Sequence, residues 1–420
     1  MFLIKGWQAL TPDARILFLT RILRMFAYGL ISVVLVLYLS ELGLSTKKIG
    51  VLLTLTLLGD TLVSLWMTTS ADRLGRRKML LTGAALMIFA GVTFALTHNF
   101  IVLLVAAIIG VISPSGNEVG PFLSIEQAAL SHIIPGRKRL QIFAWYNLVG
   151  SFAVALGALT GGILAQRLHA VGFTMLAGYR ATVVGYAFMG LLLALLFLSL
   201  SDSVEIKNSA DDHQLSTRTF LGLHRSHKII LKLSALFALD AFAGGFVMQS
   251  LLAYWFHVKF GLAAGFLGAI LFGANILAGI SALSAAKLAS RIGLINTMVF
   301  THLPSNILLI LVPLMPNVQL AVAVLFLRFA ISQMDVPARQ AYTISVVHPN
   351  ERSAAGGITG IARTIGVGLS PIIAAPLIAS TSLLSLPFFV AGGLKILYDL
   401  LLYRSFKTVT PPDEHSSSPK

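Results

Sequence analysis

Twelve apolar segments of about 20 residues or more restrict what this chain can fold into. They cover residues 16–39, 47–71, 79–97, 101–131, 140–165, 176–200, 229–256, 264–288, 293–312, 318–347, 353–379 and 384–403. A helix of about 20 residues crosses the hydrocarbon core of a bilayer. Only 11% of the 420 residues are charged, against about 25% in soluble domains. The sequence therefore predicts an all-α polytopic membrane protein with twelve transmembrane helices.

Several classes of protein are excluded by what the sequence lacks. It has no cysteine, so it offers no disulfide or thiolate metal site. It contains no G-x-x-x-x-G-K-[ST] loop and no H-E-x-x-H or G-x-S-x-G motif. We therefore expect no ATP-driven transport, no enzymatic activity, no metal and no cofactor. No polar stretch is long enough for a separate soluble domain, which argues against a receptor.

The net charge of +15 follows the loops that connect the apolar segments. Alternate loops carry 20 Lys and Arg residues on one side of the membrane and 5 on the other. Cytoplasmic loops are the ones enriched in Lys and Arg, so both termini are predicted to be cytoplasmic. This distribution explains the basic charge without nucleic acid. The compact loops favour a bacterial cytoplasmic (inner) membrane.

A polar linker at 201–228 divides the chain into two groups of six segments, at 1–200 and 229–405. Residues 406–420 are predicted to form a disordered cytoplasmic tail. The linker histidines His213, His224 and His227 lack the close spacing of metal ligands, which favours a solvated loop over a metal site.

The two groups share landmarks at a nearly constant offset. Residues 26–29 (Phe-Ala-Tyr-Gly) match 242–245 (Phe-Ala-Gly-Gly) at an offset of 216. The Gln-Ala pair at 127–128 matches 340–341 at 213, and Gly150 matches Gly366 at 216. Fixed-offset similarity of this kind indicates a duplicated unit, as in transporters with parallel repeats. We therefore predict two pseudo-symmetric six-helix bundles.

One loop carries a resemblance to a known family. The sequence Asp-Arg-Leu-Gly-Arg-Arg-Lys at 72–78 resembles the D-R-x-G-R-R/K loop of the major facilitator superfamily of secondary transporters. The resemblance implies a monomeric carrier in the lipid bilayer that moves a small molecule by alternating access. It also implies a cytoplasmic gating latch, formed by Asp72, Arg73, Gly75, Arg76 and Arg77. The alternative is that these basic residues only determine topology.

A second pattern bears on direction of transport. Residues 157–162 (Gly-Ala-Leu-Thr-Gly-Gly) are similar to the G-P-x-x-G-G pattern associated with antiporters, with Ala158 in place of the proline.

Charged residues inside the spans are the candidate functional residues, because a charge at the bilayer centre costs at least about 2.5 kcal/mol. The acids are Asp60, Glu118, Glu126, Asp240 and Asp335; Asp399 is set aside because it lies near the predicted cytoplasmic end of its span. A rise of 1.5 Å per residue places Asp60, Glu126, Asp240, Arg24 and Arg363 roughly 14–18 Å from the cytoplasmic ends. They are predicted to share a polar cavity.

The repeat relates these charges to one another. Arg24 corresponds to Asp240, and Glu126 corresponds to Arg339. The resemblance implies that their four helices line a central cavity, where the charges either couple substrate and proton or form fixed ion pairs. Arg328 and Arg339 lie 7 and 4 residues from Asp335 on one helical face and are expected to neutralise it. Asp240 or Glu126, whose helices offer no nearby cation, is the predicted proton site, with Glu118 and Asp60 behind them. Arg363 is a further candidate partner for the central acids.

The fourth span contains two prolines and two glycines between Ser113 and Pro121, which predicts a bend. The bend is either a moving gate with exposed carbonyl groups or a static packing kink. Asn117 and Glu118 are expected nearer the outer side, as contacts where substrate enters or leaves.

The aromatic residues are expected mainly at the membrane interface or in packing. Tyr254 and Trp255 are interpreted as interfacial residues. Trp145 and Tyr146 pack between helices or border the cavity.

These observations predict proton-coupled efflux of a small organic molecule by antiport. Arg24, Arg339 and Arg363 support an alternative, the proton-coupled uptake of a charged nutrient such as an organic anion or siderophore. A third hypothesis is a membrane sensor or scaffold without transport activity.

Overall fold

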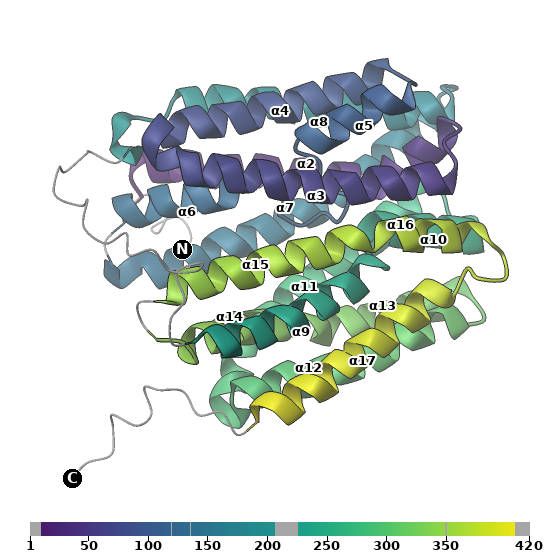
Figure 1. The fold of residues 1–420 in the computed structure, drawn as a ribbon. Coiled ribbons are helices and arrows are strands. Elements are labelled where there is room, and N and C mark those ends of the chain that lie inside the picture. Colours follow the sequence, from purple (N-terminus) through teal and green to yellow (C-terminus); the bar gives the residue numbers. More distant parts are fainter. Residues whose placement is uncertain (1–9, 119, 135, 206–225, 349–350, 408–420) are drawn as a thin grey trace, which may run out of the picture. The chain divides into compact units, whose positions relative to one another are not determined.

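The computed structural model describes residues 10–118, 120–134, 136–205, 226–348 and 351–407, and all regular elements there are helices (Figure 1). Eleven helices or joined helix pairs are long and apolar enough to cross a membrane, and one shorter apolar helix, α5, accompanies them. The predicted all-α polytopic fold is therefore confirmed.

The first predicted group of spans contains α2 (Pro12–Glu41), α3 (Thr46–Leu74), α4 (Arg76–Leu96), α5 (Phe100–Ile109), α6 (Phe122–Ile133), α7 (Gly136–Ala170), α8 (Met175–Leu198) and the 3-10 turn η1 (Asp202–Val204). The second contains α9 (His227–Gly245), α10 (Gln249–Phe260), α11 (Ala264–Ile292), α12 (Leu294–Leu311), η3 (Val312–Leu314), α13 (Val318–Ser332), α14 (Asp335–Ser345), α15 (Arg352–Leu369), α16 (Pro371–Ala379) and α17 (Leu386–Phe406).

Four of the predicted spans are not continuous helices. The fourth is split into α5 and α6 by residues 110–121, so the expected bend is a full break. The seventh, tenth and eleventh are split into α9 and α10, α13 and α14, and α15 and α16. Glycine or proline accompanies each of these breaks, because both residues disfavour a helix interior. In the tenth span Pro337 has no N–H to donate to the carbonyl group of Gln333, and α13 ends just before that residue. The prediction of one continuous tenth helix is therefore wrong.

The chain forms two compact units. The first contains residues up to 208 together with 249–272, and the second contains 209–248 with 273–420. In the first unit α2 packs against α7, α8 and α10, and α4 packs against α8. In the second unit α9 packs against α15, and α12 packs against α17 and α13. Residues 206–225 of the predicted linker and 408–420 of the predicted tail lie outside the described part of the chain.

Close packing of α7 on α2 explains the glycines of the 157–162 pattern. A Cβ atom at Gly157 would overlap the Phe26 carbonyl oxygen, and one at Gly161 would overlap that of Leu30. Glycine permits this backbone contact because it has no side chain. The pattern therefore has a structural role in the first unit, whatever the direction of transport.

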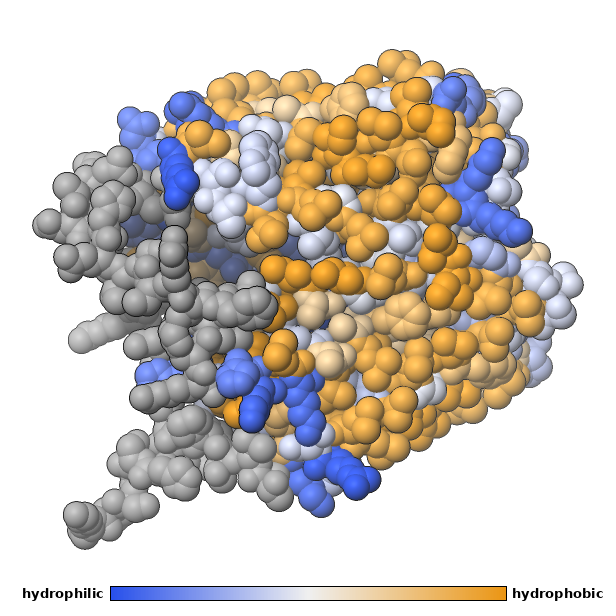
Figure 2. All heavy atoms as spheres, in the orientation of Figure 1, coloured by the Kyte–Doolittle hydropathy of each residue, from blue (hydrophilic) through white to orange (hydrophobic). Residues whose placement is uncertain are grey.

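Apolar side chains cover much of the face drawn in Figure 2, and hydrophilic residues gather towards the helix ends. Leu62, Phe188 and Phe300 are each more than half exposed, as expected for side chains that face lipid. Trp255 differs from its predicted interfacial placement. It is fully buried and packs edge-to-face on Phe256 at 5.0 Å between ring centres, in a helix that packs against α2.

Candidate functional site

The charged residues inside the spans gather in two buried clusters, one in each unit. The first-unit cluster contains Arg21, Arg24, Glu118 and Glu126. The second-unit cluster contains Asp240, His302, Asp335, Arg339, Arg363, Lys395 and Asp399. The first-unit cluster has two cations and two carboxylates, and the second has three carboxylates, three Lys and Arg side chains and His302.

Arg24 and Glu126 form the centre of the first-unit cluster. Arg24 Nη1 and Nη2 donate to the two carboxylate oxygens of Glu126, each at 2.7 Å. Both side chains are fully buried. Two parallel charge-assisted hydrogen bonds make a strong and directional contact. This pair fixes α2 against α6.

Hydroxyl groups and aromatic rings complete this environment. Thr20 Oγ1 donates to Glu126 at 2.8 Å, and the Tyr146 hydroxyl donates to it as well. The Arg24 guanidinium lies 4.8 Å from the Phe122 ring centre, a cation–π contact. Tyr146 is fully buried here, whereas Trp145 is 40% exposed.

The unwound segment at 110–121 contributes the second acid. Arg24 Nε donates to Glu118 at 2.8 Å, and Arg21 pairs with the same carboxylate. Glu118 lies on the unwound segment and contacts α2, and its position nearer the outer side stays a prediction. Asn117 beside it is exposed. Gly116 and Gly120 have φ values of +69° and +79°, which no regular helix contains.

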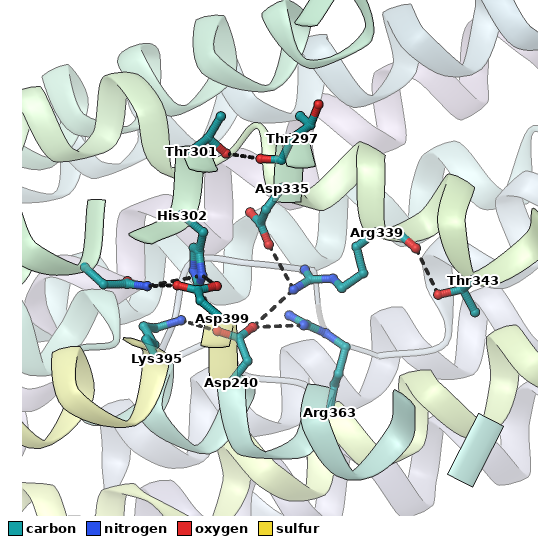
Figure 3. Close-up of polar contacts among 11 residues, drawn as sticks. Asp240, Thr297, Thr301, His302, Asp335, Arg339, Thr343, Arg363, Lys395 and Asp399 are labelled. Atoms are coloured by element: carbon teal, nitrogen blue, oxygen red, sulfur yellow. Dashed lines mark hydrogen bonds and ion pairs between the residues drawn. The ribbon is translucent and has the colours of Figure 1, made fainter. Parts of the chain in front are cut away.

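Asp240 is the shared carboxylate of the second-unit cluster (Figure 3). Its Oδ1 lies 2.5 Å from Lys395 Nζ. Its Oδ2 lies 3.1 Å from Arg339 Nη1 and 3.3 Å from Arg363 Nη1. These cations come from α17, α14 and α15, so one carboxylate joins four helices. The expected contact of Arg363 with a central acid is thus present.

His302 of α12 lies between two carboxylates. Its Nδ1 is 2.8 Å from Asp399 Oδ1 and its Nε2 is 3.7 Å from Asp240 Oδ1. Asn306 Nδ2 donates to Asp399 Oδ2 at 2.9 Å. Asp399 is fully buried, so setting it aside as a residue of the helix end was wrong. The missed signal is a polar stripe in α12, formed by Thr297, Thr301, His302, Ser305 and Asn306.

Asp335 pairs within its own helix, as expected. Its Oδ2 lies 3.0 Å from Arg339 Nη1, four residues along α14. Arg328 belongs to α13, on the other side of the break. The prediction that Arg328, Asp335 and Arg339 share one continuous helical face is therefore wrong.

The central ion pairs occupy equivalent positions of the sequence repeat. Arg24 pairs with Glu126 in one unit, and Asp240 pairs with Arg339 in the other, with opposite polarity. As expected, the helices of Glu126 and Asp240 offer neither acid a cation one turn away, and the cations that pair with them come from other helices. The alternative of ion pairs at these positions is therefore present in the structure. The role of Glu126 and Asp240 in coupling stays a prediction.

Asp60 of α3 is the predicted acid that joins neither cluster. It is 6% exposed, and its Oδ1 has no hydrogen-bond partner. Among the described residues none forms an ion pair with it within 4.0 Å.

The basic loop between α3 and α4 contacts the end of α8 and the residues after it. Gly75 has a φ of +102°, which lets the chain turn sharply between the helices. The Glu205 carboxylate then accepts from the backbone N–H groups of Arg76 and Arg77, at 2.8 and 3.0 Å. Arg73 is exposed, and the side chain of Asp72 lies outside the described part of the chain. The gating role of this loop remains a prediction.

A family model for the Major Facilitator Superfamily matches residues 17–371. The chain belongs to the major facilitator superfamily. It is therefore a multi-pass membrane transporter. The membrane protein YJR124C of Saccharomyces cerevisiae is 32% identical over 423 residues, with 94% of each chain covered.

Other similarities are partial or structural. The quinolone resistance protein NorA of Staphylococcus aureus is 27% identical over 158 residues, 38% of this chain and 39% of NorA. The crystal structure of a D-xylose–proton symporter superposes with a TM-score of 0.71 at 14% identity, covering 95% of this chain and 98% of the symporter. At this identity the symporter supports the fold alone.

Proposed function

We propose that this transporter exports a small organic molecule in exchange for protons, by alternating access. The observation that carries the proposal is the set of buried acids on membrane-spanning helices, in and beside the two clusters. Ionisable groups inside membrane spans are costly and usually mark ion or substrate pathways. A proton or charged group that enters either cluster changes its balance of charge.

The direction rests on sequence similarity. NorA is named for quinolone resistance, which suits an exporter. The antiporter-like pattern at 157–162 supports the same direction.

The second-unit cluster contains the ion pair that a ligand can most readily replace, since Arg363 binds Asp240 at 3.3 Å and its side chain is 34% exposed.

The same Arg363 favours the second candidate, proton-coupled uptake of an organic anion. An exposed guanidinium beside a buried carboxylate can exchange that carboxylate for the carboxylate of a ligand. In this case an anion would compete with Asp240 for Arg363. Export of a neutral or cationic compound has no such requirement.

Comparative metabolomics tests the proposal. Cells that express the wild type or the double variant Glu126→Gln, Asp240→Asn are compared by untargeted analysis of medium and cytosol. Export predicts a compound enriched in the medium with the wild type only. A compound depleted from the medium and accumulated inside cells would establish uptake and contradict the proposal.

Proteoliposomes then test coupling. The identified compound is loaded with an imposed pH gradient, with the gradient collapsed by an ionophore as the control. Proton exchange predicts accumulation only while the gradient lasts. Movement that is equal with and without the gradient would refute proton coupling and leave the direction assignment intact.

We also propose that both termini are cytoplasmic. Because the chain has no cysteine, single-cysteine variants report topology without background. An impermeant maleimide added to intact cells should label Val171→Cys and spare Ser417→Cys. The reverse pattern would overturn the orientation.

A further inference from the structure

Asp60 stands apart from the other acids inside the spans. Glu118 and Glu126 pair with arginines of α2. Asp240 and Asp335 pair with Arg339. Asp399 accepts from His302 and Asn306. Asp60 is equally buried, yet its Oδ1 has no partner and the described residues place no cation against it.

The surroundings of Asp60 are polar but uncharged. The Gly120 backbone amide and the Ser64 hydroxyl lie near the Asp60 carboxylate. Ser64 Oγ, one turn along α3, also lacks a partner that satisfies hydrogen-bond geometry. Tyr28 of α2 and Tyr186 of α8 interact with it electrostatically.

The elements packed against α3 supply no neutralising cation. They are α2, α4, α5 and α6. No residue of α5 is titratable, and Glu126 of α6 is engaged by Arg24. On α2, Arg21 and Arg24 are engaged by Glu118 and Glu126. The basic residues of α4 begin at Arg76, 16 residues beyond Asp60, which corresponds to roughly 24 Å along a helix.

An isolated carboxylate in such a place is costly. Burial of an unpaired charge disfavours the ionised form, and the group takes up a proton instead. A hard cation is the other way to neutralise it, but such ions are held by several oxygen ligands. The described residues contain no group of three or more His, Asp or Glu side chains that could hold a metal ion. The surroundings favour the proton.

We propose that Asp60 carries an exchangeable proton and is the proton-coupling residue of this transporter. The proton sits on a carboxyl oxygen when the site is closed to water, and it leaves when hydration or a nearby cation stabilises the carboxylate. The proton-binding part of this inference stands by itself, and the coupling part rests on the proposed function.

The unwound segment links Asp60 to the first-unit cluster. The Gly120 amide that acts on Asp60 is two residues from Glu118, which binds Arg21 and Arg24. The charge of Asp60 is therefore felt close to the segment that holds Glu118. Protonation of Asp60 would in this way change the electrostatic environment of the first-unit cluster.

Infrared titration tests proton binding without any substrate. The absorption of protonated carboxyl groups is followed in purified protein between about pH 5 and pH 9. We expect a titrating band that Asp60→Asn removes. The matched control is Asp335→Asn, which removes an ion-paired acid and should leave the band in place. Ser64→Ala, which keeps the acid, should shift the band frequency.

Absence of any Asp60-dependent band would overturn the proposal, because the carboxylate would then be ionised throughout. The alternative that Asp60 binds a monovalent cation is tested by thermal stability in sodium. Melting temperatures are compared in sodium chloride and choline chloride, for the wild type and Asp60→Asn. Stabilisation by sodium that depends on Asp60 would replace the proton with a monovalent cation and refute the proposal.

Transport assays distinguish a loss of proton coupling at Asp60 from a failure of the proposed function. With the compound found by metabolomics, Asp60→Asn should retain exchange of labelled for unlabelled substrate and lose accumulation driven by a pH gradient. Equal gradient-driven accumulation in variant and wild type would overturn the coupling role. If no compound is transported at all, the proposed function fails while the infrared result still decides proton binding.

Discussion

The two clusters use the same positions of a duplicated unit in different ways. In the first unit, one arginine and one glutamate bind each other through two hydrogen bonds and exclude solvent completely. In the second unit, one aspartate is shared by Lys395, Arg339 and Arg363, and Arg363 is partly exposed. The duplicated unit has preserved the location of an ion pair and not its sign.

This difference predicts unequal sensitivity to substitution. A two-residue pair leaves one uncompensated charge when it is broken. A shared carboxylate leaves several, and breaking a buried ion pair by removing one partner costs about 3–5 kcal/mol. The second-unit cluster should therefore be the more fragile of the two.

Asp240→Asn should have the largest effect on stability. It leaves Lys395 and Arg363 without a carboxylate, while Arg339 keeps Asp335. We expect the free energy of unfolding to fall by about 3–5 kcal/mol, measured by denaturation in detergent. A smaller loss of unfolding free energy than that caused by Glu126→Gln would contradict the expectation that the second-unit cluster is the more sensitive one.

Glu126→Gln should cost less, about 2 kcal/mol. The amide oxygen can still accept from Thr20 and Tyr146, and Glu118 still binds Arg24. The same denaturation assay measures the difference.

The reversed polarity of the second unit suggests a control. The exchange Arg24→Glu with Glu126→Arg restores an ion pair of the opposite sign, as at Asp240 and Arg339. The double variant should be more stable than Arg24→Glu alone. Equal instability would show that Thr20 and Tyr146 fix the polarity of the first-unit pair.

Glu205→Gln provides a reference outside both clusters. The Glu205 carboxylate accepts from the first two amides of α4, where negative charge is favourable at a helix N-terminus. We expect a loss of about 1 kcal/mol and faster hydrogen exchange at residues 76–80. Unchanged exchange there would mean that water replaces the carboxylate without cost.

Arg363→Gln should have the smallest effect on stability, about 0.5 kcal/mol, because its side chain is partly exposed. The Arg363→Gln variant distinguishes the two candidate functions. An anionic substrate predicts a selective rise in Kd, measured by equilibrium binding of the compound found by metabolomics. Unchanged Kd would favour export of a neutral or cationic compound.

The sequence predicts the fold well because twelve apolar segments and their charged loops leave little choice of topology. It also predicts that Arg24, Glu126, Asp240 and Arg339 are special, since charge inside a span has a clear cost. Their pairing could not be predicted, because a neutralising partner on another helix leaves no local pattern.

Asp399 is a second residue whose partner on another helix could not be predicted from the sequence. Distance along the chain places it near a helix end, and the packing of α17 against α12 brings it beside His302. The break after Ser332 has a signal in the sequence, Pro337, which removes the hydrogen bond to the carbonyl group of Gln333 and which the prediction of one continuous span overlooks. The sequence predicts Asp60 as a midplane acid, and only the structure shows that it lacks the partner that Glu126 and Asp240 possess.

The bidentate Arg24–Glu126 pair also imposes an order on biosynthesis. Its two residues are 102 positions apart, so at about 5–20 residues per second the arginine is made roughly 5–20 s before its glutamate. During that interval the first span carries an uncompensated charge that resists release into lipid, at about 2.5–3.5 kcal/mol. This cost favours retention of the first helix beside the insertion machinery, or beside another polar helix, until α6 has been synthesised.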